Sequence, residues 1–280
     1  MPQHKILAVT SKARFGAHVS SYNVFRGRSV DGTPILAVIS GLTRRKSRRS
    51  KNGKTGPMAQ VSVYVDNGES PGSNVRSGAD KGVCNDCPLR PSEASTCREC
   101  GHAVAVGPHI WQCKECGTWN IRCYVVTDKG EASKHKAAEP RPVDMSGALA
   151  VIASDPSIRV RFGSYGNMSN IPREALEPML QACADRPKGW TLYEHRWADP
   201  RFQWLRAYAM ASVSSLAEAR EASALGWRYF RAREPGEPLQ HNEAECPSAR
   251  GVSCYNCGLC NGVGTDERRA RVRSITITGH

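Results

Sequence analysis

The sequence has no long apolar run. Its longest uninterrupted apolar stretches, residues 35–39 and 148–153, are far shorter than the ~20 residues that a membrane-spanning helix needs. The opening residues, MPQHKILAVTSK, lack the apolar segment of a secretory signal. We therefore expect no membrane association and a cytoplasmic location.

Acidic residues are scarce in the first part of the chain. Residues 1–83 contain 14 Lys/Arg against 4 Asp/Glu, a net +10, whereas residues 84–280 contribute 25 minus 22, or +3, to the total of +13. Clustered basic side chains attract polyanions because they release counterions from phosphates. This asymmetry predicts a nucleic-acid partner, and the alternative is a basic face that serves solubility alone.

The densest basic segment follows a predicted strand at residues 33–40. Gly53-Lys54-Thr55 resembles the end of a phosphate-binding P-loop, but Arg48 stands where that motif requires glycine, and Pro57 opposes the helix that must follow. We expect instead a basic loop between strands that contacts a phosphate backbone without reading sequence. The basic residues predicted to bind nucleic acid are Arg44, Arg45, Lys46, Arg48, Arg49, Lys51 and Lys54.

Twelve cysteines stand in this chain of 280 residues, and eleven of them lie within residues 84–123 and 246–260. Most form C-x-x-C pairs. In a chain without an export signal, that arrangement favours metal binding over disulfides. The twelfth, Cys183, shares an apolar helical face with Leu176, Met179 and Leu180, so we expect an inert core thiol.

The sharpest motif pairs Cys97-Arg-Glu-Cys100-Gly with Cys113-Lys-Glu-Cys116-Gly. Two C-x-x-C-Gly knuckles at this separation are typical of a zinc ribbon, in which four thiolates hold one tetrahedral ion. His102 and His109 then need not be ligands. The motif predicts a zinc site but does not decide between a structural role and nucleic-acid contact.

The remaining cysteines form two further sets. If the ribbon is a self-contained insertion, its stem brings Cys84, Cys87 and Cys123 around one site. Three thiolates either leave an open coordination position or take a fourth ligand from elsewhere. The C-terminal set comprises Cys246, Cys254, Cys257 and Cys260, and its C-x-x-C-x-x-C run favours an iron–sulfur cluster, with zinc as the competing occupant.

The hydrophobic pattern predicts an α/β fold. Strand-like runs at residues 4–11, 20–27, 33–40 and 59–66 indicate a basic, β-rich N-terminal lobe, residues 1–83. Residues 84–127 form the cysteine region with the ribbon at 97–116, and residues 128–145 read as a polar linker. In residues 146–240, strands alternate with helices near 171–186 and 215–225, which predicts a partial, barrel-like βαβ domain. Residues 241–280 carry the C-terminal cysteine set and a last strand.

Ligands of parallel α/β folds gather where strands end. The residues at these predicted ends are Ser164, Tyr165, Asn167, Glu194, His195, Arg231 and Arg233. Glu194 and His195 are adjacent on a strand and should face opposite sides, so they form no catalytic pair by spacing. His195 is either a packing histidine or a general base, and the arginines either clamp a phosphate or carboxylate or lie at the surface.

Several motifs resemble an uncharacterised family of cysteine-rich phage and prophage proteins: CNDCPLR, CYV, RFGSYGN, MASV, GWRYFR and the C-terminal CP…C-x-x-C-x-x-C, with SKNGKTGPMAQ upstream. The resemblance covers most of the chain, and the ribbon is an extra insertion. It implies a phage context and a location in the host cytoplasm. More distantly, C-x-x-C with a later CY is similar to three-cysteine radical-SAM-like proteins, although their C-x-x-x-C-x-x-C run is missing. That likeness implies an iron–sulfur cluster that binds S-adenosylmethionine.

Two functions follow from these observations. The first is an enzyme whose open cluster modifies nucleic acid, with the C-terminal set as an auxiliary cluster. The second is a non-enzymatic, zinc-dependent DNA- or RNA-binding protein of phage replication or regulation. A protein-interaction module stays open as a third.

Overall fold

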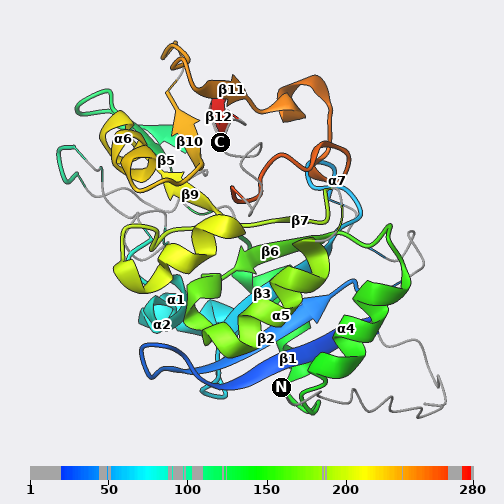
Figure 1. Cartoon of the computed structure of the whole chain (residues 1–280). Coiled ribbons are helices and arrows are strands. Elements are labelled where there is room, and N and C mark those ends of the chain that lie inside the picture. Colours follow the sequence, from blue (N-terminus) through cyan, green and yellow to red (C-terminus); the bar gives the residue numbers. More distant parts are fainter. Residues whose placement is uncertain are drawn as a thin grey trace.

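The computed structural model describes residues 20–43, 49, 52–87, 90, 97, 99–102, 110–121, 123, 125–184, 186, 188–234, 236–263 and 273–278. Its strands form two five-stranded sheets and one two-stranded sheet, and helices pack on both larger sheets (Figure 1). The chain therefore has the mixed α/β fold that the sequence predicts.

The first sheet has the strand order β1-β2-β3-β6-β7. Its members are β1 (Ser21–Arg28), β2 (Pro34–Ser40), β3 (Ala59–Val65), β6 (Val160–Tyr165) and β7 (Trp190–Thr191). The pairs β1–β2 and β2–β3 are antiparallel, while β3–β6 and β6–β7 are parallel. Because β3 pairs with β6, the N-terminal strands share a sheet with the predicted α/β domain.

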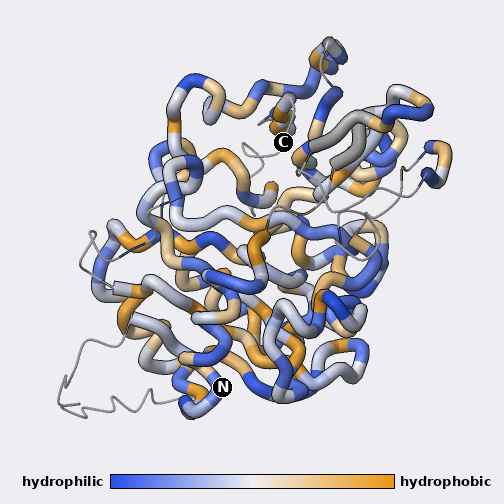
Figure 2. The backbone as a smooth tube through the Cα atoms, turned by 180° about the vertical axis from the view of Figure 1, so that it is seen from behind, coloured by the Kyte–Doolittle hydropathy of each residue, from blue (hydrophilic) through white to orange (hydrophobic). Residues whose placement is uncertain are grey.

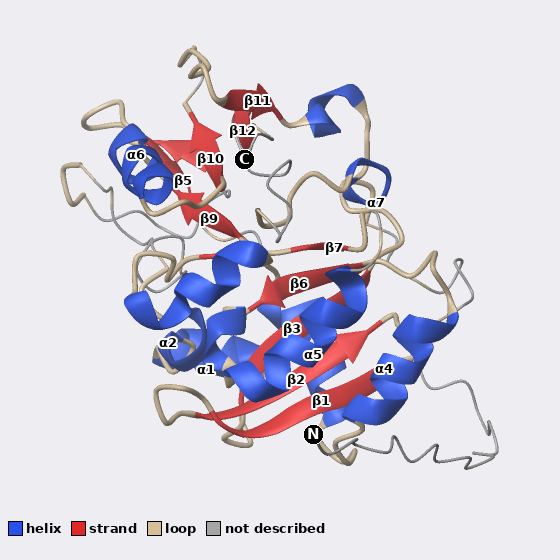
Figure 3. Cartoon of the chain, in the orientation of Figure 1, coloured by secondary structure: helices blue, strands red, loops and turns tan. Residues whose placement is uncertain are grey.

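The second sheet is entirely parallel, with the order β11-β12-β10-β9-β8. It contains β8 (Tyr193–Glu194), β9 (Met210–Val213), β10 (Tyr229–Arg233), β11 (Glu243–Glu245) and β12 (Ser274–Thr278). Only Leu192 separates β7 from β8. One short segment therefore passes from the first sheet, drawn below, to the second, drawn above (Figure 3).

Helices connect and cover these sheets. They are α1 (Pro71–Ser77), α2 (Lys81–Cys84), α3 (Ala132–Ala138), α4 (Met145–Ser154), α5 (Arg173–Ala184), α6 (Leu216–Ala224) and α7 (Cys254–Cys257). Residues Thr127–Glu131 form a π-helical turn, and 3₁₀ turns lie at Met168–Asn170, Pro200–Ala207 and Pro247–Arg250. Helix α6 is capped at its N-terminus: the Ser215 hydroxyl accepts from the Glu218 N–H at 3.1 Å, and the Glu218 carboxylate accepts from the N–H of Ser214, one residue before the cap.

One continuous apolar core joins the two sheets. It contains Val61 and Phe162 of the first sheet, Leu180 and Cys183 of α5, and Tyr229 of the second, all almost fully buried. Burial raises the pKa of Cys183 to about 12, as expected of an inert core thiol. Figure 2 shows the apolar residues recurring along the packed elements. A smaller apolar cluster lies on the second sheet and includes Cys246 and Cys260.

The structure corrects three expectations. Residues 1–83 form no separate lobe, because their described strands share the sheet and core of later elements. Residues 128–145 are no linker: they contain α3, and Glu131, His135 and Ala138 are buried. The helix expected from 171 begins at Arg173. The strand expected at 4–11 lies outside the described residues. Among the described helices, none is both long and apolar enough to cross a bilayer.

Candidate metal centres

The two cysteine knuckles of the ribbon adopt matching backbone conformations. The N–H of Cys97 donates to the His102 carbonyl, and the N–H of Cys113 donates to the Thr118 carbonyl, both at 2.9 Å. In each knuckle the glycine after the second cysteine has a positive φ, 70° at Gly101 and 73° at Gly117. Glycine adopts this left-handed conformation without steric cost, which explains why a glycine follows each C-x-x-C pair.

The four ribbon sulfur atoms gather into one group. Cys97, Cys100, Cys113 and Cys116 all lie with their sulfurs within 4.8 Å of one another and could hold a metal ion. The Cys97–Cys116 and Cys100–Cys113 sulfurs are 3.5 Å and 3.7 Å apart. Two thiolates on one tetrahedral ion with bonds of about 2.3 Å are about 3.8 Å apart, so the spacing fits a single ion. The short strands β4 (Ile110–Gln112) and β5 (Trp119–Ile121) pair beside it.

A second group, the three-cysteine site, comprises Cys84, Cys87 and Cys123. Its sulfur atoms are less closely spaced than those of the ribbon. Burial raises the pKa of Cys84 well above its usual value, and the nearby Cys123, Asp80 and Cys87 raise it further. Cys123 and Cys87 therefore both lie within electrostatic range of Cys84. The three sulfurs do not gather as tightly as the ribbon sulfurs, because the ribbon is the only such group among the described residues.

A buried ion pair holds the turn that carries Cys84 and Cys87. Asp80 and Arg90 are almost fully buried and approach to 3.4 Å. The Arg90 backbone N–H donates to the Cys87 carbonyl, and the Cys87 N–H donates to the Cys84 carbonyl. The turn is therefore closed from both ends by backbone hydrogen bonds and by the Asp80–Arg90 ion pair.

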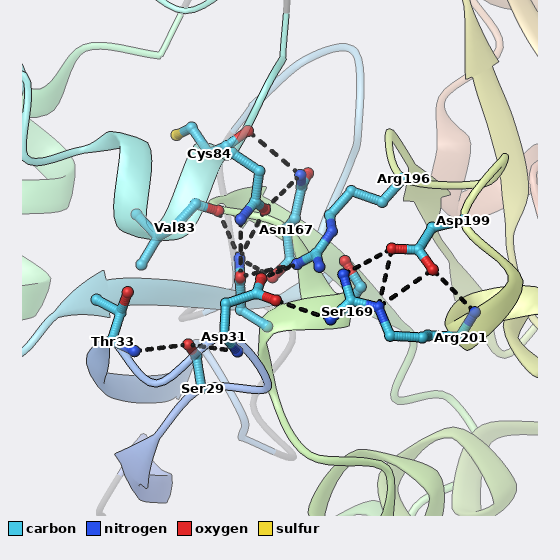
Figure 4. Close-up of polar contacts among 12 residues, drawn as sticks. Ser29, Asp31, Thr33, Val83, Cys84, Asn167, Ser169, Arg196, Asp199 and Arg201 are labelled. Atoms are coloured by element: carbon cyan, nitrogen blue, oxygen red, sulfur yellow. Dashed lines mark hydrogen bonds and ion pairs between the residues drawn. The ribbon is translucent and has the colours of Figure 1, made fainter.

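Three asparagines bind this turn to the loop after β6. The Asn85 side-chain oxygen accepts from the Nδ2 atoms of Asn167 and Asn170 at 3.0 Å and 3.1 Å, and Asn167 also donates to the Cys84 carbonyl. Asn85 has a φ of 53°, a backbone conformation that residues other than glycine rarely adopt. In Figure 4 the sulfur of Cys84 points away from these amides.

The same loop is bound to the end of β8. Arg196 donates to Asn170 Oδ1 at 3.4 Å and pairs with Asp31 at 2.7 Å, and Asp31 also pairs with Arg201 (Figure 4). Glu194 is fully buried and accepts from the Ser169 hydroxyl and the Arg196 N–H, both at 2.8 Å. Burial raises the pKa of Glu194.

His195, between these two anchored residues, lies next to the three-cysteine site. Its Nε2 atom is 4.0 Å from Cys87 Sγ, and loss of hydration lowers the pKa of the ring to about 4. The side chains of Glu194 and His195 meet different partners, as adjacent residues at the end of a strand should. The predicted residues Asn167, Glu194 and His195 thus surround one loop cluster, and Tyr165 lies at the end of β6 beside it.

The other predicted ligand residues have internal partners. Ser164 is buried, and its hydroxyl lies 2.7 Å from that of Ser62. Arg231 is 1% exposed and pairs with Glu243 at 2.7 Å and with Glu237. Arg233 donates to Glu245 and to the Glu237 carbonyl. Both arginines, for which a ligand clamp and surface exposure were the alternatives, are thus buried and paired with carboxylates of the chain itself.

The C-terminal cysteine set packs against the second sheet. Cys246 and Cys260 share an apolar cluster with Met210 and Ile275, and the charges of Cys254, Cys246 and Cys257 affect the pKa of Cys260, which burial raises to about 12. These four cysteines lie in one neighbourhood, although not within single-ion spacing of one another.

The segment that resembled a P-loop binds this set through its backbone. The N–H groups of Cys254 and Tyr255 donate to the carbonyls of Lys54 and Thr55, both at 2.9 Å. A Cβ atom at Gly56 would lie 2.9 Å from that of Tyr255, so only glycine allows this approach. Burial lowers the pKa of Lys54, while the neighbouring Cys246 and Cys254 raise it. Lys54 is therefore half-buried and lies within electrostatic range of these cysteines.

Arg49 was also predicted to bind nucleic acid, and the structure places it elsewhere. Its side chain is fully buried and donates to the carbonyls of Thr43 and Ser157 at 2.8 Å and 2.9 Å and to Asp155 at 3.0 Å. It is therefore a structural residue and not a phosphate contact. Arg44, Arg45, Lys46, Arg48 and Lys51 lie outside the described residues.

The structure also shows a polar cluster that the sequence pattern did not predict. Buried Glu131 accepts from the hydroxyls of Ser62 at 2.9 Å and Tyr64 at 2.7 Å, and pairs with Lys134 at 2.6 Å. The alternation of polar residues at 60, 62 and 64 in β3 marks the face that receives it. Glu131 itself lies in a polar stretch that has no such pattern.

No known family model matches the chain, and neither a curated protein nor a solved structure is detectably similar to it. Its function must therefore be argued from the sites themselves.

Proposed function

We propose that the chain is an iron–sulfur metalloenzyme whose reactive centre is the three-cysteine site. The observation that carries this proposal is the position of Cys84 and Cys87 at the carboxyl ends of parallel β6 and β8, beside Asn167 and His195. Parallel α/β folds bind ligands and perform chemistry at this edge. The parallel strands from β3 to β12 would then form the partial barrel that surrounds the substrate.

The metal chemistry follows from the number of thiolates. Three cysteines on a four-iron cluster leave one iron for another ligand, which is a substrate, S-adenosylmethionine or a fourth protein group. When bound, the cluster supplies one-electron chemistry; the chain supplies its position, and the amide network of Asn85, Asn167 and Asn170 fixes that position. The C-terminal set would hold an auxiliary cluster, and the ribbon one zinc ion.

The proposed substrate is nucleic acid in a phage-infected host cell. The net charge of +13, and +10 within residues 1–83, supports a polyanionic substrate. The logarithm of the affinity falls with the logarithm of the salt concentration, and each phosphate contact contributes about 0.9 to the steepness of that fall. Replacing Arg44, Arg45 and Arg48 together should therefore make the slope shallower by about 2.7 for duplex DNA. Arg220→Ala, an exposed change on α6, is the control and should leave the slope unchanged.

The test of the enzyme is the metal and sulfide content of protein purified without oxygen. Iron and acid-labile sulfide at about four each per cluster, with one zinc, support the proposal. Cys87→Ser should remove one cluster, while Cys183→Ser, which changes a buried thiol of α5 outside all three sets, should remove none. Colourless protein that contains zinc alone refutes the iron–sulfur enzyme.

A second candidate function is a zinc-dependent nucleic-acid-binding protein. The ribbon supports it, since its four sulfurs have the spacing of a single tetrahedral ion. All three sets would then hold structural zinc, and salt-dependent binding would persist in protein that contains no iron.

A further inference from the structure

We propose that Arg161 and Lys54 bind the terminal phosphate group of a nucleotide between the three-cysteine site and the C-terminal cysteine set. This inference deepens the proposed function and rests on it, since it names the part of a nucleic-acid substrate that the chain holds. The ligand is a phosphate monoester, which is carried either by a free nucleotide or by the phosphorylated end of a strand.

Arg161 belongs to a polar row that crosses three strands of the first sheet. It lies opposite Gln60 of β3 on one side and opposite Thr191 of β7 on the other. Residues paired in this way point to the same face of a sheet. On that face, the Nζ atom of Lys134 in α3 donates to Gln60 Oε1 at 2.9 Å. The row therefore lies on the side of the sheet on which α3 packs.

Arg161 also lies between two of the cysteine sets. Burial raises the pKa of Cys123 and of Cys254, and the charge of Arg161 lowers it in both cases. Cys123 belongs to the three-cysteine site and Cys254 to the C-terminal set, so the guanidinium is within electrostatic range of both. A phosphate bound to Arg161 would therefore place its nucleotide beside the proposed reactive centre.

Lys54 brings a second positive charge to the same place. Its segment is joined to the C-terminal set, because the Cys254 N–H donates to the Lys54 carbonyl at 2.9 Å. Burial lowers the pKa of Lys54, and the nearby charge of Arg161 lowers it further. Both residues are half-buried, so a solute can reach them while water screens their charges only in part. An anion between these two cations would relieve their mutual repulsion.

The number and type of these charges favour a phosphate monoester. Arg161 and Lys54 contribute two positive charges, which match the charge of about −1.5 to −2 that a phosphate monoester has at pH 7. A carboxylate, or a phosphate inside a strand, carries only one. Lys134 on the same face is paired with Glu131 at 2.6 Å and adds no net charge. The planar guanidinium can donate two parallel hydrogen bonds to phosphate oxygens, and the ammonium group adds a point charge.

The test is isothermal titration calorimetry of the metal-containing protein with adenosine monophosphate and with adenosine, which lacks the phosphate. It compares the wild type with Arg161→Gln and Lys54→Gln. The matched controls are Arg220→Gln in α6 and Lys136→Gln in α3, which remove the same charges from exposed positions. A short single strand with a terminal phosphate, and the same strand with a terminal hydroxyl, show whether the phosphate comes from a free nucleotide or from a strand end.

We expect the wild type and both controls to bind the phosphorylated form of at least one probe more tightly than the form without phosphate. This affinity should fall about 10- to 100-fold in Arg161→Gln and in Lys54→Gln, because each loses a charge-assisted interaction. Arg161→Lys keeps the charge without the planar fork, so its affinity should lie between those of the wild type and Arg161→Gln. Circular dichroism checks that each variant is folded, and Lys54→Gln alone decides if Arg161→Gln is not.

Three results would overturn the inference. The first is a wild type that binds the phosphorylated and unphosphorylated forms equally, and the second is unchanged phosphate affinity in folded Arg161→Gln and Lys54→Gln. The third is loss of metal from Arg161→Gln with unchanged phosphate affinity, because the guanidinium would then serve the cysteine sets alone. The proposed function fails separately: protein that contains zinc alone refutes the iron–sulfur enzyme, whatever its affinity for phosphate.

Discussion

Replacing Arg49 should lower the free energy of unfolding, and this effect should not depend on nucleic acid. The guanidinium of Arg49 is fully enclosed and donates to two carbonyls and to Asp155, so Arg49→Ala leaves several buried acceptors without a donor. Removing one partner of a buried pair costs about 3–5 kcal/mol. Because the Asp155 side chain is 19% exposed and can regain water, we expect the lower end, about 3 kcal/mol.

Urea unfolding of Arg49→Ala and of the exposed-site control Arg220→Ala measures this cost.

The pH dependence of this stabilisation has a definite sign. Burial raises the pKa of Asp155, but hydrogen bonds from Ser157 and the charge of Arg49 outweigh it, so the folded pKa is lowered. The contribution of Asp155 is therefore complete above its unfolded pKa of about 3.9 and is lost as the pH falls through the lower, folded value. The difference between Arg49→Ala and the wild type should shrink accordingly in acid.

Nucleic-acid affinity, measured on folded protein, completes the experiment. Equal unfolding free energies for Arg49→Ala and Arg220→Ala, together with weaker nucleic-acid binding of Arg49→Ala alone, would refute the structural role of Arg49. That result would return Arg49 to the phosphate-binding loop.

Three further predictions test other parts of the structure. Gly56→Ala should weaken the docking of the C-terminal cysteine set, because its Cβ would lie 2.9 Å from Tyr255 Cβ at a φ of 71°; faster proteolysis after residue 246 measures this, and an unchanged rate contradicts it. Cys113→Ser should lower the zinc content by one ion and leave any iron in place, as elemental analysis would show. Glu243→Ala should cost about 3–5 kcal/mol in urea unfolding, because Arg231 keeps only its Glu237 partner; a cost below 1 kcal/mol would speak against a buried pair.

Local signals in the sequence predict the structure correctly where the stabilising partners are close in the chain. The ribbon follows from cysteine spacing and two glycines, and its four sulfurs do gather. Helix α6 follows from Ser215 and Glu218, which cap it within one turn. The burial of Cys183 follows from its helical period. In the ribbon and in α6 the deciding contacts join residues 19 and 3 positions apart, so a local pattern can record them.

The errors concern residues whose partners are distant. Arg49 reads as one more surface cation, and its carboxylate partner lies 106 residues further along the chain. Residues 128–145 look like a polar linker because Glu131 and His135 are polar, yet hydroxyls from β3 and the ring of Tyr64 accommodate them. A buried polar residue is recognisable only with its partner, and a periodic pattern of apolar residues does not show that partner.

The place of the ribbon in the chain couples its closure to that of the three-cysteine site. Residues 88–122 separate Cys87 from Cys123, and the ribbon cysteines lie within that interval. Closing a loop costs entropy that grows with its length, by about 0.6 kcal/mol for each doubling. An ion that ties Cys97 to Cys116 therefore shortens the free loop that Cys123 must close. Without an ion in the ribbon, closing that loop would cost about 0.6 kcal/mol more, because the ribbon takes up about half of it.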